Sequence, residues 1–399
     1  MKAVVWHGVG DIRLDDVPDP TISDPTDAII EVTASGICGT DLHFVRGTMP
    51  GMVEGTILGH EAVGIVRETG PGVRNLREGD RVVIPSTIGC GYCSYCRAGY
   101  YAQCDNANPN GGGAGTCFFG GPQTTGPVDG LQAQYARIPY ANVGPVWLPD
   151  EVGDDAALML SDIYPTAWFG ARLADVSQGD TVLVLGAGPV GQFAVTSAFQ
   201  QGAGRVLVVD GVPSRLDQAR RRGAEAIDFN AEDPVAVVKE LTGGIGVDRV
   251  IDAVGVDAQR PRSGPAAEQA DQQAQQFDAE RAQVAPDQNP HGQTYVAGDA
   301  PSQSLEWAVQ AVAKAGSIGV YPPQLTAFPT GAAMNKNLSI KMGNCNHRRY
   351  LPHLLDLVRT GAVDPATVLT QVEDLPTVLQ AYETFDRRES GWTKAVIAP

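Results

Sequence analysis

The chain has 399 residues, of which 43 % are hydrophobic, so it can bury the cores of two or three domains without covalent staples. Its formal charge of −17 would repel phosphate backbones and anionic lipid surfaces, which excludes nucleic acids and membranes as expected partners. Met1 begins a short strand-like run without the features of a signal peptide, and the odd number of cysteines indicates reduced thiols. We therefore expect a cytoplasmic protein whose partner is a small molecule.

The first 155 residues contain many short β-like runs between Gly and Pro residues, which predicts a partly closed, barrel-like fold. Within it, Cys38 stands in GICGTDLH, and His60 and Glu61 stand in LGHEAVGIV. With Asp162 of LSDIYPT they offer a thiolate, an imidazole and a carboxylate, the ligands of a catalytic Zn²⁺ that keeps a fourth position open. Residue type alone leaves alternatives open, since Cys38 fits a small buried hydrophobe, His60 a core histidine and Asp162 a turn residue.

Four cysteines, Cys90, Cys93, Cys96 and Cys104, lie in one short loop. Thiolates two residues apart can turn toward one centre, and four of them satisfy a tetrahedral Zn²⁺ with no position left for substrate. Two disulfides are the alternative, but they would require an oxidising compartment. The spacing therefore favours a structural zinc site.

Residues 181–210 read TVLVLGAGPVGQFAVTSAFQQGAGRVLVVD, which predicts a strand, a glycine-rich turn, a helix and a second strand. Gly186 permits a tight turn, Gly188 lets the backbone approach a pyrophosphate, and Gly191 allows close packing of helix on strand. Pro189 and Val190 complete the GAGPVG turn, where the free N–H groups of the helix would face the phosphates. The unit predicts a dinucleotide cofactor.

Asp210 ends the second strand of this unit, where a carboxylate would accept the hydroxyls of an adenosine ribose. It would also repel a 2′-phosphate, which favours NAD over NADP. A solvated acid at the end of the strand is the alternative, and the nearby Arg215 blurs the choice between the two cofactors.

The middle of the chain, residues 156–332, alternates helices and strands, which predicts a doubly wound parallel sheet. From about residue 333 the chain should return to the catalytic domain and complete it, through a strand at 338–342, a helix at 350–359 and a closing strand at 393–397. Between these parts, residues 257–300 form a polar, glutamine-rich insertion with a helix expected at 266–281. This insertion either covers the cofactor or is a solvated loop.

Taken together, these motifs resemble the zinc-containing medium-chain alcohol dehydrogenases. The run Gly59-His60-Glu61-x₂-Gly64-x₅-Gly70-x₂-Val73 agrees with the zinc signature of that family. The CGTDLH motif, the four-cysteine loop, GLQAQYARIP and the GAGPVG turn occur in the family's order. LSDIYPT is similar to the LSDxxPT of the glutathione-independent formaldehyde dehydrogenase and dismutase branch. The resemblance implies an α/β protein with a GroES-like catalytic domain and a Rossmann domain.

The resemblance also implies roles for single residues. Cys38, His60 and Asp162 would bind the catalytic zinc, although many family members carry Cys or Glu in the slot of Asp162. Glu61 would be an alternative ligand or part of a salt bridge under the site. The four clustered cysteines would bind the second Zn²⁺ of each subunit.

Thr40 and His43 resemble the family's relay, in which a hydroxyl, the nicotinamide ribose and an imidazole pass a proton to solvent. A helix cap and a surface side chain are the alternatives for these two residues. Thr166 and Lys394 are expected near the cofactor, with a plain surface lysine as the alternative for Lys394.

The expected function is therefore that of a zinc-dependent oxidoreductase that transfers hydride between NAD and a small alcohol or aldehyde hydrate. An aldehyde dismutase with tightly bound NAD(H) is the second hypothesis. A binding protein of the same fold without turnover is the third. By family habit we expect a homodimer or homotetramer.

Overall fold

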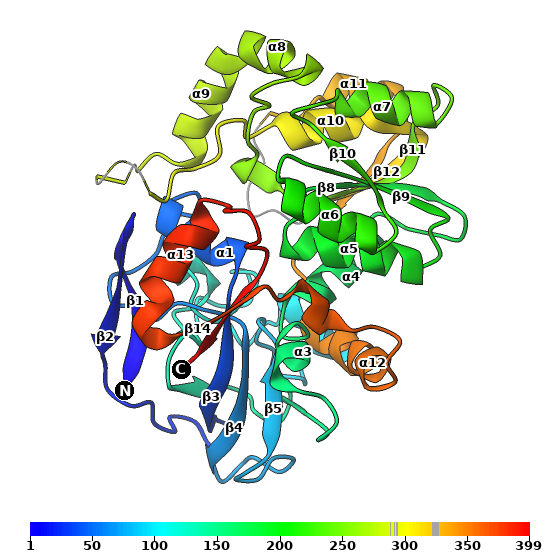
Figure 1. Ribbon diagram of the computed structural model, residues 1–399. Helices are drawn as coiled ribbons and strands as arrows, with labels where there is room; N and C mark the ends of the chain where they lie inside the picture. Colours follow the sequence, from blue (N-terminus) through cyan, green and yellow to red (C-terminus); the bar gives the residue numbers. More distant parts are fainter. Residues whose placement is uncertain (288, 291, 293, 321–326) are drawn as a thin grey trace.

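The computed structural model describes residues 1–287, 289–290, 292, 294–320 and 327–399. Figure 1 shows two lobes, a lower one that holds both chain termini and an upper one built around a parallel sheet. Gln288, His291 and Gln293 of the predicted insertion lie outside the described residues. The predicted α/β fold with two different sheets is confirmed.

The lower lobe is organised by β3, which pairs with β4, β6 and β15. Most of its ten residues are buried, which explains the apolar run that precedes Cys38. The sheet order is β14-β15-β3-β4-β5-β7, with β6 beside β3 and a separate hairpin of β1 and β2. These strands are β1 (Lys2–Gly8), β2 (Asp11–Asp16), β3 (Ala28–Ile37), β4 (Ala62–Thr69), β5 (Arg81–Ile84), β6 (Tyr135–Ile138), β7 (Val146–Trp147), β14 (Gln371–Asp374) and β15 (Ala395–Ala398).

The upper lobe contains, among the described residues, a six-stranded parallel sheet of order β10-β9-β8-β11-β12-β13. This is the strand order of a dinucleotide-binding fold. The order reverses between β8 and β11, so a ligand cleft is expected at the carboxyl ends of these two strands. The strands are β8 (Thr181–Leu185), β9 (Arg205–Asp210), β10 (Glu225–Asp228), β11 (Val247–Asp252), β12 (Val312–Val320) and β13 (Ser339–Met342).

Helices cover both faces of the upper sheet. Val182 and Val184 of β8 pack in the apolar cluster that includes α4 and α5, whereas Leu183 and Leu185 pack in the cluster that includes α7 and α10. Burial on both faces explains the uninterrupted apolar run of this strand. The helices are α1 (Gly39–Arg46), α2 (Ser94–Arg97), α3 (Asp154–Leu158), α4 (Ile163–Leu173), α5 (Pro189–Gln200), α6 (Pro213–Arg221), α7 (Pro234–Leu241), α8 (Pro265–Gln272), α9 (Ala274–Val284), α10 (Gln303–Ala311), α11 (Thr330–Asn335), α12 (His347–Arg359) and α13 (Val378–Asp386).

The structure differs from the predicted boundaries at two places. The strand expected at 338–342 in the catalytic domain is β13, which pairs with β12 at the edge of the upper sheet. The chain therefore returns to the lower sheet only after Met342. The helix expected at 266–281 is two helices, α8 and α9, which meet at Gln273. A short edge strand has little apolar pattern to reveal its partner, and β13 is largely exposed.

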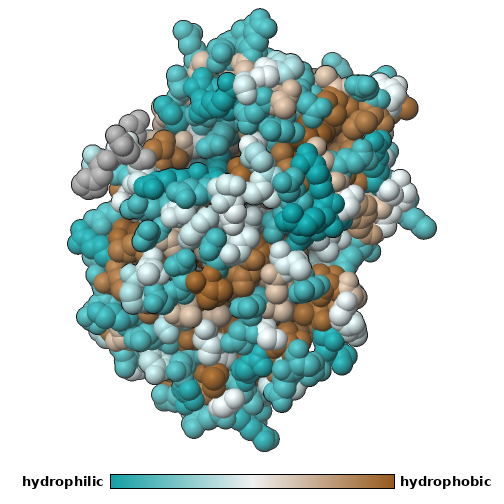
Figure 2. All heavy atoms as spheres, in the orientation of Figure 1, coloured by the Kyte–Doolittle hydropathy of each residue, from teal (hydrophilic) through white to brown (hydrophobic). Residues whose placement is uncertain are grey.

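The visible surface is mostly hydrophilic, and its hydrophobic residues form separate small groups (Figure 2). The most exposed large apolar side chains include Ile245, in the loop between α7 and β11, and Met334, on α11. Single exposed apolar residues of this kind are normal on protein surfaces. Within the described ranges, no helix is both long and apolar enough to span a bilayer.

Candidate functional site

A cleft of about 380 Å³ brings the predicted site residues together. From the lower lobe it is lined by Cys38, Thr40, His43 and His60, and from the upper lobe by the loops that follow β8, β9 and β11. The cleft therefore lies at the carboxyl ends of the parallel strands, where open α/β sheets bind their ligands.

Four metal-binding side chains converge at this cleft. One donor atom each of Cys38, His60, Glu61 and Asp162 lies within 4.8 Å of the others, and all four residues are buried. Asp162 Oδ2 is 3.7 Å from Cys38 Sγ and 3.3 Å from His60 Nε2. A sulfur, a nitrogen and a carboxylate oxygen at this spacing suit a tetrahedral Zn²⁺. The structure thus brings together the three predicted ligands and also Glu61.

The donor atoms lack the partners that such atoms normally have. Both ring nitrogens of His60 and Oε1 of Glu61 are buried without a hydrogen bond, although carboxylates lie near them. Leaving a buried polar atom unsatisfied costs about 1–3 kcal/mol. Burial also raises the pKa of the Cys38 thiol, and the charge of Glu61 raises it further. The donor set therefore fits a bound cation, which would satisfy the free atoms and stabilise the thiolate.

Asp41, in the first turn of α1, orients two of these ligands. Its Oδ2 accepts the backbone N–H of Cys38 at 2.9 Å, and its Oδ1 lies 3.2 Å from Nδ1 of His60. Gln132 donates to Asp41, and the hydroxyl of Tyr382 donates to Gln132. A carboxylate at the far nitrogen of a ligand histidine fixes the orientation of the ring. The CGTDLH motif thus supplies a ligand and the group that orients a second ligand.

His347, the first residue of α12, holds the second oxygen of Asp162. Its Nε2 is 2.6 Å from Asp162 Oδ1, and the hydroxyl of Thr166 donates to the same oxygen at 2.8 Å. The other ring nitrogen of His347 is 3.1 Å from Thr87 Oγ1. Asp162 Oδ2 is thereby left to face the sulfur and the imidazole. Thr166 also lines the cleft, as its predicted position near the cofactor requires.

Glu61 and Lys394 form an ion pair in which both side chains are 0 % exposed. Lys394 Nζ is 2.5 Å from Glu61 Oε2 and donates to the carbonyl of Ile37 at 2.9 Å. Lys394 does not line the cleft. It is fully buried, so the alternative interpretation of Lys394 as a plain surface lysine is wrong. The pair joins Glu61, a member of the metal cluster, to the residue that immediately precedes β15.

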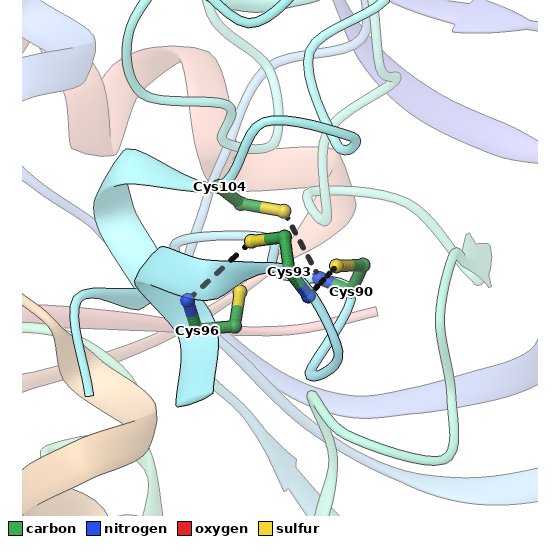
Figure 3. Close-up of side chains that lie close together, drawn as sticks. All are labelled: Cys90, Cys93, Cys96 and Cys104. Carbon is green, nitrogen blue, oxygen red and sulfur yellow. Dashed lines mark hydrogen bonds between the residues drawn. The ribbon is translucent and has the colours of Figure 1, made fainter. Parts of the chain in front are cut away.

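The four-cysteine loop forms a second cluster, in which the four sulfur atoms all lie within 4.8 Å of one another (Figure 3). Backbone N–H groups point at the sulfurs, as from Cys90 to Cys104 Sγ at 3.2 Å and from Cys96 to Cys93 Sγ at 3.4 Å. Burial opposes ionisation of Cys93, but the backbone N–H groups of Cys96 and Asp105 help to lower the pKa of its thiol to about 7. All seven cysteines are free, so the disulfide alternative is wrong. The cluster fits a closed Zn²⁺ site.

The GAGPVG turn connects β8 to α5 and lines the cleft. Gly186 has φ +88°, a conformation that L side chains rarely adopt. A Cβ atom on Gly191 would lie 1.9 Å from the carbonyl oxygen of Gly186. Gly188 caps α5, whose second residue, Val190, lines the cleft next to Pro189. The glycines therefore have the turn and packing roles that the sequence predicts, and the N-terminus of α5 is available to an anionic group.

Asp210 lies at the cleft with its carboxylate fixed by the backbone. Oδ2 accepts the N–H of Ala187 at 2.7 Å, and Oδ1 accepts that of Val212 at 2.8 Å. Arg215 also lines the cleft. Its Nη1 lies close to the glycine turn, about 4.0 Å from the position that a Cβ atom on Gly188 would take. Its Nε is buried without a hydrogen bond. Arg215 thus stands beside the glycine turn, where a phosphate would pair with it.

Comparisons with known proteins agree with this geometry. Residues 24–150 match the model of the alcohol dehydrogenase GroES-like domain, and residues 189–263 match that of the zinc-binding dehydrogenases. The chain is 38 % identical to an uncharacterized zinc-type alcohol dehydrogenase-like protein, AdhB, of Bacillus subtilis, over 100 % of both chains.

The chain belongs to the zinc-type medium-chain alcohol dehydrogenase family.

Two further relatives show which members of the family this dehydrogenase resembles. The solved alcohol dehydrogenase TADH from Thermus sp. ATN1 superposes with a TM-score of 0.79 at 30 % identity, over 100 % of this chain and 99 % of that chain. The glutathione-independent formaldehyde dehydrogenase of Pseudomonas aeruginosa is 38 % identical over 64 % of this chain and 86 % of its own length. The formaldehyde branch is therefore one partial relative among several. The protein is an alcohol dehydrogenase-like oxidoreductase with a structural Cys₄ zinc site and a catalytic zinc site of cysteine, histidine and carboxylate.

The relay predicted for this alcohol dehydrogenase lies on α1, next to the metal cluster. Thr40 and His43 both line the cleft, and Thr40 Oγ1 is 3.9 Å from Cys38 Sγ. His43 is only 8 % exposed, so it is not a surface side chain. Burial lowers the pKa of His43, and the partly opposing charge of Asp257 does not offset this effect.

Sequence reasoning missed three residues that contact the predicted site residues of this dehydrogenase. Asp41 lies inside a motif that drew attention only to Cys38, Thr40 and His43. His347 and Asp257 carry no local signature, because the partners that give them a role lie far away in the sequence. Only the sharp polarity of the insertion could have directed attention to Asp257.

Proposed function

We propose that this protein is an NAD-dependent zinc dehydrogenase that transfers hydride between NAD and a small alcohol or aldehyde hydrate. The observation that carries the proposal is one cleft that joins the Cys38, His60 and Asp162 cluster to the GAGPVG turn. When bound there, Zn²⁺ polarises a substrate oxygen and lowers the pKa of its proton, and NAD accepts the hydride.

Cys38, His60 and Asp162 hold the catalytic Zn²⁺ in this proposal, and the four clustered cysteines hold the structural one. Asp162 is preferred to Glu61 as third ligand because its Oδ2 faces both the sulfur and the imidazole. Oε2 of Glu61 is engaged by Lys394. The free Oε1 of Glu61 would make it an alternative ligand of the bound metal.

Thr40 and His43 move the hydroxyl proton of the substrate toward solvent. Both residues line the cleft, and the metal cluster begins two residues before Thr40, at Cys38. His43 is neutral at pH 7 because burial lowers its pKa, so it is in the form that accepts a proton.

NAD is held by the turn after β8 and by the end of β9. Asp210 orients the adenosine ribose and disfavours a 2′-phosphate. Arg215 pairs with the pyrophosphate, since its Nη1 lies about 4.0 Å from the position of a Cβ on Gly188 and its buried Nε has no hydrogen bond. Lys394 acts only indirectly, through Glu61. The backbone contacts come from Gly186, Gly188, Pro189 and Val190, which line the cleft together with Thr166. Gly191 contributes by letting α5 pack closely on the turn at Gly186.

The test is a panel of small alcohols and aldehydes, assayed at 340 nm with added NAD. We expect turnover of at least one compound, a lower rate with NADP, and loss of turnover after a chelator removes zinc. Asp162→Ala should lose catalytic zinc while it keeps the zinc of the four cysteines, as measured by elemental analysis. Turnover that survives complete removal of zinc would refute the proposal.

The aldehyde dismutase remains a second candidate because the insertion begins at the cleft. Ala258, Gln259, Arg260 and Arg262 line this cleft, where they would slow the release of bound NAD(H). A dismutase converts an aldehyde without added cofactor and carries nucleotide through purification. Absence of both properties would leave the dehydrogenase.

We further propose that residues 1–155, with the chain after Met342, form the catalytic unit, and that the residues between them bind the cofactor. The protein should work in the cytoplasm as a homodimer or homotetramer. Light scattering of the zinc-loaded protein tests the assembly, and a monomer would overturn it.

A further inference from the structure

The relay histidine of the proposed function has an acidic neighbour from the other lobe. Asp257 lies in the short turn that follows β11, at the start of the glutamine-rich insertion. Its Oδ2 is 3.0 Å from Nδ1 of His43 on α1. The two side chains are 9 % and 10 % exposed, so water screens their charges only weakly.

The orientation of Asp257 is fixed from several directions. Its Oδ1 accepts the N–H of Gly298, which closes the base of the insertion. Arg46 donates to Oδ2 at 2.9 Å and also binds Asp386, while Arg388 donates to the backbone carbonyl of Asp257. Although burial opposes ionisation, Arg46 and His43 lower the pKa of Asp257 below its ordinary value. Asp257 is therefore a fixed carboxylate and carries a negative charge at neutral pH.

The contacts of His43 distinguish its two ring nitrogens. Nδ1 is 2.6 Å from Thr48 Oγ1, and this hydroxyl donates to the carbonyl of His43 itself at 3.4 Å. Thr48 is then an acceptor toward Nδ1, and the carboxylate of Asp257 lies 3.0 Å from the same atom as an ion-pair contact. The accepting hydroxyl of Thr48 and the negative charge of Asp257 both favour the proton of the neutral ring on Nδ1. The printed contacts of the ring, with Thr48 and Asp257, are both at Nδ1, which leaves Nε2 without a partner among the residues that the structure describes, and His43 lines the cleft.

We propose that Asp257 is a positioning residue for the proton relay, which keeps the proton of neutral His43 on Nδ1 and leaves Nε2 free to accept the substrate's proton. The inference rests on the relay role of His43 in the proposed function. As Nε2 gains the proton, the O–H bond that carried it breaks, and its electron pair stays on oxygen. The resulting imidazolium is stabilised by the charge of Asp257 until a water molecule takes the proton away.

The inference also gives the insertion a role beyond covering the cofactor. Asp257 belongs to the upper lobe, and His43, Thr48 and Arg46 belong to the lower lobe. The relay is complete only when the base of the insertion rests on α1. The charged groups that face His43 are Asp257, Arg46 and Arg388, and without Asp257 only the two arginines would remain.

The first test measures His43 directly. The zinc-loaded protein, labelled with ¹³C at the Cε1 atoms of its six histidines, is titrated by NMR, and His43→Gln assigns the signal. Because Asp257 raises the pKa of His43 while burial and the arginines lower it, Asp257→Asn should lower that pKa. Asp257→Glu should restore it in part. An unchanged His43 titration in Asp257→Asn would overturn the inference.

The second test follows hydride transfer against pH, with the alcohol that the 340 nm panel shows to be oxidised fastest. Asp257→Asn should lower kcat by about tenfold or more, within the range that general-base catalysis contributes. The acid limb of its profile should move to lower pH. In a His43→Gln background, Asp257→Asn should have almost no further effect on kcat, because both changes remove one function.

Asp299→Asn is the matched control. Asp299 is a carboxylate of the same insertion, is 13 % exposed and binds Arg260 and Arg262, but it has no contact with His43 among the described residues. Its variant should keep the parental acid limb and His43 titration, whatever it does to thermal stability. If Asp299→Asn and Asp257→Asn have the same acid limb and the same His43 titration while His43→Gln has a lower kcat, the inference about Asp257 fails. The relay role of His43 then stands. If His43→Gln keeps the parental rate and profile, the relay of the proposed function itself fails.

Discussion

Replacement of Lys394 by Met should be among the most destabilising single changes in this protein. Lys394 and Glu61 are both 0 % exposed, and their charged atoms are 2.5 Å apart. Met has a similar length, so the substitution removes the charge and leaves the shape of the core. The carboxylate of Glu61 would then lose its partner at Oε2, and Oε1 has no hydrogen bond to begin with. A buried charge left without its partner costs about 3–5 kcal/mol.

Urea unfolding followed by tryptophan fluorescence, with zinc bound, measures this loss in the free energy of unfolding. The double variant Glu61→Gln/Lys394→Met should lose less than half as much, since no charge is left unpaired. Lys2→Met is the control, because Lys2 and Asp16 form an exposed pair that contributes at most about 1 kcal/mol. If Lys394→Met costs no more than Lys2→Met, the buried charge is solvated or neutral, and the reasoning is wrong.

The metal sites, the cofactor turn and the relay give four more predictions. Cys96→Ser should lower the zinc content by one ion per subunit, and elemental analysis that finds no change would exclude a zinc site there. His347→Ala should weaken the binding of the catalytic zinc about 10–100-fold in a chelator competition, since Asp162 Oδ1 loses the hydrogen-bond partner that orients the carboxylate. Gly191→Ala should abolish NAD binding in a fluorescence titration because its Cβ would meet the Gly186 carbonyl at 1.9 Å, whereas Gly153→Ala, in open space, should bind normally. The acid limb of kcat should lie below pH 6.5 and be absent in His43→Gln, because burial lowers the pKa of His43 from 6.5 and only the neutral ring accepts a proton.

The sequence was most informative where chemistry depends on residues close together in the chain. The spacing of the four cysteines predicts their cluster because a short loop alone brings the sulfurs together. The GAGPVG turn is readable for the same reason, since the clash at Gly191 is with Gly186, five residues earlier. Cys38, His60 and Asp162 come from three separate segments, and only the family resemblance joined them.

The sequence was least informative where a polar residue obtains its role from a distant partner. His347 touches Asp162, which lies 185 positions earlier in the chain. No periodicity or spacing indicates such a contact, and a histidine at the start of a helix has no distinctive pattern. The prediction of which sheet β13 joins failed for a related reason. A short and largely exposed strand can extend either sheet without a change in its apolar pattern.

The contacts of Asp162 and Asp257 with residues far away in the sequence both lie where the two lobes meet. Cys38 and His60 are carried by the lower lobe, whereas Asp162 caps α4, which packs against the upper sheet. The same apolar cluster includes Ala34 and Val63 of the lower sheet, so α4 is held from both sides. Asp257 likewise reaches from the upper lobe to α1. Metal site and relay are each completed by one residue from across the cleft, so a change in the relative position of the lobes would disturb both at once.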